Sequence, residues 1–151
     1  MTFQTIAITR AGFARLEAEL NHLKYHVRPQ ISQAVMDAYD LGDLPENSEY
    51  DAARDNQSVC EAKISKLEHL YSHALVIDPV PRGIIEFGVT AVLGLGAGRK
   101  KAAWQVVSQY ESDADSGRLS ISSPLAKALL GKRVGDRVKM NNKEYAVLEI
   151  R

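Results

Sequence analysis

Two apolar repeats, separated by a short polar break, constrain the fold of this chain more than any other feature. The first runs from Phe13 to Leu41 in steps of 3, 4, 3, 4, 4, 3, 4 and 3 residues, and the second from Tyr50 to Ala74 in steps of 3, 4, 3, 4, 3, 4 and 3. This spacing is typical of a coiled-coil seam. Two helices of about 30 residues joined by a short turn form an antiparallel hairpin roughly 45 Å long. A hairpin of this length exceeds one compact domain, so we expect its turn to project into solvent.

Local sequence signals agree with the two predicted helices. Thr9 is a suitable N-cap for the first helix, and Asn47 or Ser48 is suitable for the second. Pro29 lies where the first repeat slips by one residue. Because proline lacks a backbone N–H, we expect a kink or a local rearrangement of the helix there. Cys60 occupies a seam position, where it is interpreted as a packed, small apolar group.

The stretch DPVPRG, residues 78–83, is rich in proline and glycine and predicts a linker. It divides the chain into a helical region, 1–77, and a second domain, 84–151. β-branched and aromatic residues in the second domain predict strands at 84–95, 102–110 and 118–122. Ser123, Pro124 and Gly131 predict a short helix at 124–130. A hairpin with an Asn-Asn turn is predicted at 136–150. The predicted fold class is therefore α+β, with an antiparallel α-helical coiled-coil hairpin followed by a small antiparallel β-sheet domain that carries a short helix.

The composition excludes several classes of protein. The single cysteine, Cys60, cannot form an internal disulfide, and no apolar run approaches the roughly 18–20 residues that a membrane span needs. The N-terminal residues do not follow the pattern of a signal peptide. We therefore expect a soluble protein of a reducing cytoplasm that does not engage a membrane. A monomer is also expected.

Negative charge is concentrated around the predicted turn. The twenty residues from Met36 to Asp55 include seven acids and one base, Arg54, although the chain has 19 of each charge overall. The rest of the chain therefore carries twelve acids and eighteen bases. Such a local concentration of acids on an otherwise basic chain favours a partner that is anionic overall but contains a cationic or metal-binding site. The alternative is a solvated helix face.

Two of these acids, Asp43 and Glu46, lie in or beside the predicted turn, near residues 41–47. Carboxylates at this spacing on a tight loop can meet one divalent cation. Mg²⁺ prefers six oxygen ligands, so two carboxylates on a convex tip bind it weakly unaided and can instead complete a site half built by another molecule. The alternative is that these acids merely cap and solubilise the turn.

Two other acid-rich chemistries fit the turn poorly. A calcium-binding loop counted from Asp40 would have Gly42, Leu44 and Pro45 at positions that need oxygen ligands or glycine. A hydrolase with paired carboxylates needs a desolvating cleft that tunes their pKa values, and a protruding turn offers none.

The stretch LGDLPENSEYDAARDNQ resembles the signature G-D-L-x-E-N-x-E-Y-x-A-A-R of the bacterial transcript cleavage factors of the Gre type. The resemblance continues in ITRAGFARLEAEL, ALVID, IEFGVTAVL and ISSPLAKALLGK, so it covers nearly the whole chain, and it is closer to the A-type members (GreA) than to the B-type. Two departures are Pro45, at a variable position of the tip, and a shortened segment at GAGRKKAAWQ.

The resemblance implies a function for the hairpin. In this family the hairpin enters the secondary channel of RNA polymerase whose RNA 3′ end has been displaced by backtracking. By resemblance, Asp43 and Glu46 position a second Mg²⁺, held jointly with the polymerase, and a water. The polymerase then cleaves its own transcript, so the factor stimulates cleavage and is not itself the enzyme. Tyr50, Arg54 and Asn47 are implied to contact RNA or the polymerase.

The resemblance also implies that the second domain has a fold like that of the FK506-binding proteins and docks at the rim of the channel. Two other functions stay open from the sequence alone. One is a paralogue with the same fold that occupies the channel and inhibits the polymerase without stimulating cleavage. The other is a coiled-coil adaptor or chaperone, for which the acids of the turn would be interchangeable with neutral residues.

Overall fold

The structure is a computed structural model that describes residues 4–96 and 100–151. The chain forms two compact units. Residues 13–74 belong to the first, and residues 6–12 together with 75–151 belong to the second. The segment 6–12 thus groups with the second unit, although the sequence-based boundary had assigned it to the helical region.

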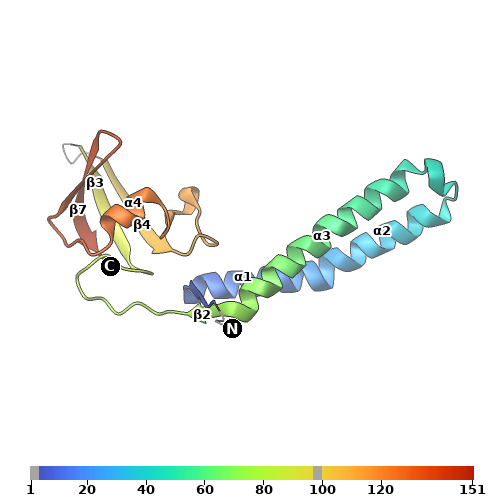
Figure 1. The fold of residues 1–151 in the computed structure, drawn as a ribbon, viewed down its shortest axis with the longest axis horizontal. Helices are drawn as coiled ribbons and strands as arrows, with labels where there is room; N and C mark the ends of the chain where they lie inside the picture. The colour runs from blue at the N-terminus through green and yellow to red at the C-terminus, as the bar shows by residue number, and fades with distance from the viewer. Residues whose placement is uncertain (1–3, 97–99) are drawn as a thin grey trace. The chain divides into compact units, whose positions relative to one another are not determined.

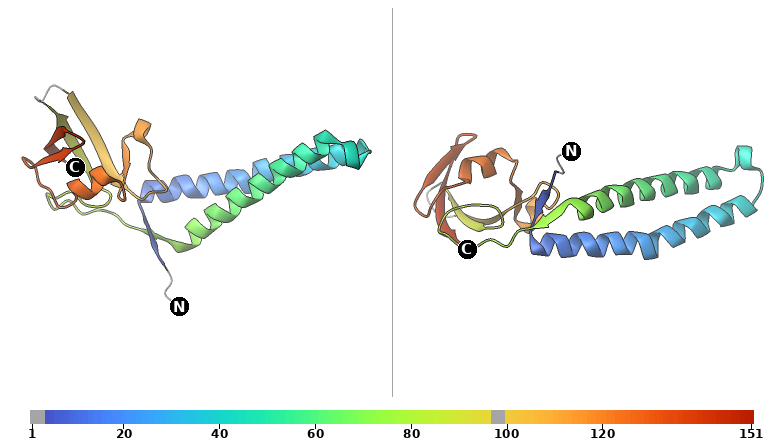
Figure 2. Two further views of the ribbon diagram at one scale, coloured as in Figure 1. Left: turned by 45° about the horizontal axis from the view of Figure 1, so that its top comes forward. Right: turned by 60° about the horizontal axis from the view of Figure 1, so that its bottom comes forward.

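The first unit is a long helical hairpin, as the two apolar repeats predicted. One arm consists of α1 (Arg10–His22), a π-helical turn (Leu23–Val27) and α2 (Arg28–Asp40), and the other is α3 (Ser48–His73). The two arms run side by side to a turn at the far end of the hairpin (Figures 1 and 2). The predicted N-cap of α1 is confirmed, because Thr9 Oγ1 accepts a hydrogen bond from the Gly12 N–H at 3.0 Å.

Most seam residues of both arms are buried or half-buried, with Ile64 only 2% exposed, whereas Ala34, Leu41 and Tyr71 are exposed. The buried set on the two arms is Leu16, Leu20, Leu23, Ala38, Ala53, Cys60, Ile64, Leu67 and Leu70. Cys60 is thus packed in the seam, as predicted. Ion pairs connect the arms beside this seam, at Lys24–Glu68, Arg28–Glu61 and Lys63–Glu19.

The slipped step of the first repeat corresponds to the π-helical turn. There the Arg28 N–H bonds to the Leu23 carbonyl, five residues back instead of four. The turn accommodates one extra residue, which keeps Leu23, Val27 and Ile31 on the side of the seam. Pro29 then falls in the first turn of α2. The rearrangement expected at Pro29 is therefore a π-helical turn.

The second unit contains two sheets. A small one pairs β1 (Ile6–Ile8) with β2 (Ala74–Val76), and a larger one has the strand order β5-β4-β3-β7-β6. The strands of the larger sheet are β3 (Thr90–Leu95), β4 (Lys100–Val107), β5 (Arg118–Ser120), β6 (Arg137–Met140) and β7 (Lys143–Ile150). The short helix α4 (Pro124–Leu129) packs on this sheet through Ala126 and Leu129, which are fully buried with Ile85 and Val106.

The larger sheet differs from the prediction in two respects. β5 pairs parallel to β4, so the sheet is mixed and not entirely antiparallel. The ten residues between these strands cross over instead of forming a hairpin, as a parallel pair requires. The first strand begins at Thr90, not at Ile84, because Gly88 adopts a left-handed φ of 84° and turns the chain just before it.

Two local predictions for this unit are confirmed. Asn141 and Asn142 both have positive φ, 51° and 64°, in the turn between β6 and β7. Ser123 caps α4 by accepting a hydrogen bond from the Ala126 N–H, and Gly131 follows the helix with a φ of 81°. The predicted glycine-rich turn between β3 and β4 includes residues 97–99, which lie outside the described residues.

Candidate functional site: the turn of the helical hairpin

The turn reverses the chain between the end of α2 at Asp40 and the start of α3 at Ser48. Two consecutive residues in the left-handed region, Gly42 with φ of 78° and Asp43 with φ of 50°, end the first arm. A 3₁₀ turn at Leu44–Glu46 follows, closed by a hydrogen bond from the Glu46 N–H to the Asp43 carbonyl at 2.9 Å.

This hydrogen bond defines the relation between the two predicted ligands. Asp43 and Glu46 stand at the first and fourth positions of a closed turn, whose Cα atoms lie within about 7 Å of each other. Both side chains are exposed, and within the described part of the chain neither carboxylate makes a hydrogen bond or ion pair. The turn thus presents two exposed carboxylates, from its first and fourth positions, with their oxygens available to a cation.

Asn47 holds the turn together. Its Oδ1 accepts a hydrogen bond from the Tyr50 N–H at 3.0 Å, which caps α3. Its Nδ2 donates to the Ala38 carbonyl at 2.7 Å and to the Gly42 carbonyl at 3.0 Å, which ties the cap to the end of α2. Asn47 is buried, and these three bonds occupy its acceptor and both donors. A contact of Asn47 with RNA or polymerase stays a prediction, while its bonds assign it to the turn itself.

Tyr50 and Arg54 lie on the first two turns of α3, as the sequence predicted. The ring of Tyr50 is half-buried and meets the ring of Tyr39 edge to face, with centroids 6.1 Å apart and an interplanar angle of 61°. Arg54 is exposed, and its Nη1 donates to Gln57 Oε1 at 3.0 Å. Sequence reasoning missed Tyr39. Its place in the last turn of α2, opposite the first turn of α3, was the available signal.

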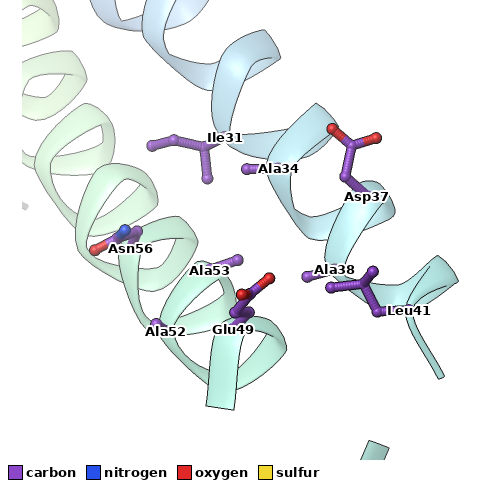
Figure 3. A pocket seen from close by; sticks show the side chains of 9 residues that line it. All are labelled: Ile31, Ala34, Asp37, Ala38, Leu41, Glu49, Ala52, Ala53 and Asn56. Carbon is purple, nitrogen blue, oxygen red and sulfur yellow. The ribbon is translucent and has the colours of Figure 1, made fainter. Parts of the chain in front are cut away.

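A groove of about 490 Å³ lies between α2 and α3 just behind the turn (Figure 3). Alanines on both arms leave this space open, because their side chains are too short to fill the seam. The lining residues are Ile31, Ala34, Asp37, Ala38, Leu41, Glu49, Ala52, Ala53 and Asn56. Apolar packing between the arms is therefore thin near the tip, and the bonds of Asn47 compensate for it.

The donor chemistry of the turn fits Mg²⁺, which prefers carboxylate oxygens and keeps several waters. Among residues 4–96 and 100–151, no group of three or more His, Cys, Asp or Glu side chains is arranged to hold a metal ion. Asp43 and Glu46 alone would therefore supply a minority of the six ligands. None of the helices in the same ranges is long and apolar enough to cross a membrane.

The fold and the turn define a class of protein: a helical hairpin that carries two carboxylates at its tip, followed by a small β-sheet unit. Comparison with known sequences assigns this class to a family. Residues 6–76 match the family described as transcription elongation factor, N-terminal, and residues 80–151 match transcription elongation factor, GreA/GreB, C-terminal. The chain belongs to the GreA/GreB family of transcription elongation factors.

Individual relatives agree with this assignment. The chain is 42% identical over 152 residues to the transcription elongation factor GreA of Ruegeria pomeroyi, with 97% of each chain covered. It is 40% identical over 153 residues to GreA of Paracoccus denitrificans, with 98% of each covered. The solved structure of the transcription factor Gfh1 is similar over 99% of both chains, with a TM-score of 0.50 and 26% sequence identity.

Proposed function

We propose that this protein binds RNA polymerase, inserts the turn of its hairpin into the secondary channel and stimulates Mg²⁺-dependent cleavage of the nascent RNA in backtracked complexes. The observation that carries this proposal is the closed turn that places Asp43 and Glu46, both exposed, at its first and fourth positions. Membership in the family of transcription elongation factors supports it.

The number of ligands explains why the activity needs two molecules. Two carboxylates bind Mg²⁺ weakly, so a stable site requires oxygens from the polymerase and from the RNA phosphate. A second Mg²⁺ held in this way would supply an activated water and stabilise the leaving oxygen of the cleaved bond. The role of this chain is to deliver and orient Asp43 and Glu46. The polymerase remains the enzyme.

The rigidity of the turn suits this role. A ligand that is delivered on a fixed backbone loses little entropy when it completes a metal site, whereas a mobile loop would have to be ordered at that moment. The two ligands are fixed through the Glu46–Asp43 backbone bond and through Asn47, which joins the ends of both arms. We propose that the second unit docks outside the channel and thereby orients the hairpin.

The test uses purified, backtracked elongation complexes with labelled RNA, Mg²⁺ and the full-length protein. We expect the wild-type protein to shorten the RNA from its 3′ end. Asp43→Asn and Glu46→Gln each remove one anionic ligand, and we expect each to lower the cleavage rate by at least about 100-fold, as loss of one electrostatic partner in an active site does. Asp55→Asn is the matched control, since Asp55 is an exposed acid of the same region outside the turn.

Other outcomes would select other functions. Slower RNA synthesis without shortening would indicate a factor of the same fold that occupies the channel and inhibits. If the protein does not bind the core polymerase in a pull-down, the adaptor function is the one that remains. Equal cleavage by wild type and by the variant with both Asp43→Asn and Glu46→Gln would refute the assignment of these two side chains.

A further inference from the structure

The tip carries an aromatic surface in addition to its carboxylates. Tyr39, in the last turn of α2, is 57% exposed, and its ring meets that of Tyr50, in the first turn of α3. We call these two residues the tyrosine pair. An edge-to-face contact with centroids 6.1 Å apart is a favourable aromatic geometry. The half-buried ring of Tyr50 supports the more exposed ring of Tyr39, which keeps much of its surface open to solvent.

The tyrosine pair is anchored on the same turn as the two carboxylates. The Tyr39 carbonyl accepts a hydrogen bond from the Gly42 N–H at 3.1 Å, and Gly42 directly precedes Asp43. The Tyr50 N–H donates to Asn47 Oδ1 at 3.0 Å, and Asn47 directly follows Glu46. Each tyrosine backbone is therefore one hydrogen bond and one peptide unit away from a ligand of the proposed metal site. The tyrosine pair and the two carboxylates are therefore carried by one and the same turn.

The charge of the region limits what the tyrosine pair can bind. Seven acids and one base among residues 36–55 repel the phosphates of a nucleic acid. The faces of unpaired bases are uncharged, and aromatic side chains stack on them regardless of sequence. The single base, Arg54, lies one helical turn beyond Tyr50 on the same face of α3, where its guanidinium can meet a phosphate next to a stacked base.

We infer that the tyrosine pair is a stacking platform for the base of the displaced RNA 3′ nucleotide, with Tyr39 as the residue that contacts the base and Tyr50 as its support. This inference rests on the proposed function and adds to it a positioning residue. Stacking of the displaced base fixes the end of the RNA relative to Asp43 and Glu46. The tyrosine pair thereby places the bond to be cleaved near the metal ligands, while the acids around it discourage any mode of binding through the phosphates alone.

The test measures coupling between the ring of Tyr39 and the displaced base. Elongation complexes are assembled on two synthetic scaffolds whose RNA ends in an unpaired 3′ nucleotide, either adenosine or an abasic ribose. Cleavage rates are measured at saturating factor. With the adenosine RNA, we expect Tyr39→Leu to lower the rate at least about fivefold, the lower bound for losing one base–aromatic stack, while Tyr39→Phe stays within about twofold of wild type. With the abasic RNA, all three proteins should cleave at the same reduced rate.

Tyr25→Leu is the matched control, because Tyr25 is an exposed tyrosine on the same arm, far along the chain from the turn. We expect it to cleave both RNAs as the wild-type protein does. Melting curves by circular dichroism verify that each variant keeps its helices. The wild-type protein alone provides a second readout, since its rate must fall when the displaced base is absent.

Any of three results with Tyr39→Leu would overturn the inference. The first is an equal loss on both RNAs, and the second is normal cleavage of both RNAs. The third is a higher factor concentration for half-maximal cleavage with an unchanged maximal rate, which would mean that Tyr39 contacts polymerase protein. Asp43→Asn in the same assay distinguishes failure of the inference about Tyr39 from failure of the proposed function. If Asp43→Asn is inactive and Tyr39→Leu is normal on both RNAs, only the role of Tyr39 falls.

Discussion

Asp43 adopts a φ of 50°, a left-handed conformation that aspartate and asparagine tolerate better than other residues with a side chain. This conformation follows Gly42, whose φ is also positive, and it directs the chain into the turn that ends at Glu46. The residue that we assign as a metal ligand therefore also has a backbone role. A substitution at this position can change the charge, the backbone or both.

Substitutions at Asp43 should separate these two roles. Asp43→Asn keeps the left-handed preference, so we expect the free energy of unfolding of the isolated protein to be unchanged. Asp43→Ala places an unfavourable side chain at positive φ and should cost about 1 kcal/mol. Urea denaturation followed by circular dichroism measures both. If Asp43→Asn were as destabilising as Asp43→Ala, the carboxylate charge would have a structural role that the structure does not show.

Asn47 provides a second prediction at this scale. Asn47→Ala removes the cap of α3 and both bonds to the end of α2, and leaves the buried Ala38 carbonyl without this donor. We expect a loss of about 1–3 kcal/mol. Asn47→Asp keeps the cap acceptor but replaces the two donors with oxygen, so it should also destabilise. Amide hydrogen exchange in the last turn of α2 should accelerate in both variants, and Ser48→Ala serves as the control.

The sequence predicted the local role of a single residue better than its partners. Asn47 was predicted as a helix cap from the preference of asparagine for that position, and the structure confirms this cap, whereas the ligand roles of Asp43 and Glu46 stay predictions. The bonds from Asn47 to Ala38 and Gly42, and the contact between Tyr39 and Tyr50, were not predicted. Both depend on how the two arms align across the turn, which propensities of single residues do not determine.

At the scale of elements, the arms of the hairpin were predictable because a seam of one period runs through each. The sequence placed an irregularity at Pro29 but did not determine its form, since a kink and an added residue both relieve a missing donor. The structure has the added residue, in the π-helical turn Leu23–Val27.

The direction of β5 could not be predicted for a different reason. A short strand after a ten-residue connection fits either direction, and only its pairing with β4 distinguishes them.

Ion pairs across the arms give the hairpin a dependence on pH. The Lys24 ammonium donates to the Glu68 carboxylate and lowers the pKa of Glu68 below its ordinary value of 4.5. A lowered pKa in the folded state means that the pair stabilises the fold above about pH 4.5, and that this contribution is lost as the pH falls through the pKa of the folded protein.

We expect Lys24→Met to raise the pKa of Glu68 back toward its ordinary value, because the hydrogen bond from Lys24 is the largest cause of the shift. Carbon NMR of the carboxyl group during an acid titration measures this pKa directly. The melting temperature of the variant should also fall less than that of the wild type between pH 6 and pH 3. Lys66→Met removes a nearby positive charge without breaking the pair, and an equal shift in that variant would contradict the assignment to Lys24.

At the scale of the whole molecule, the boundary between the units was the part that sequence patterns did not resolve. Residues 6–12 group with the second unit, where Thr9 Oγ1 donates to the buried Glu111 carboxylate across 102 positions of sequence. A Cβ atom on Gly12 would overlap that carboxylate, so a larger residue at this position requires the Glu111 side chain to move. Contacts of such sequence separation leave no local periodicity from which the grouping of residues 6–12 could be predicted.

The charge distribution leads to a prediction about competition. Seven acids are concentrated in residues 36–55, and the rest of the chain carries twelve acids and eighteen bases, so the positive charge that docking on an anionic partner would use lies outside the turn. If docking and metal delivery are separate, the variant with both Asp43→Asn and Glu46→Gln binds polymerase as the wild-type protein does but cannot support cleavage. Under saturating conditions, an equimolar mixture should then cleave at about half the wild-type rate by mass action. An undiminished rate at a roughly tenfold excess of the variant would instead mean that the two carboxylates provide much of the binding free energy, because a competitor that lacks them would no longer occupy the polymerase.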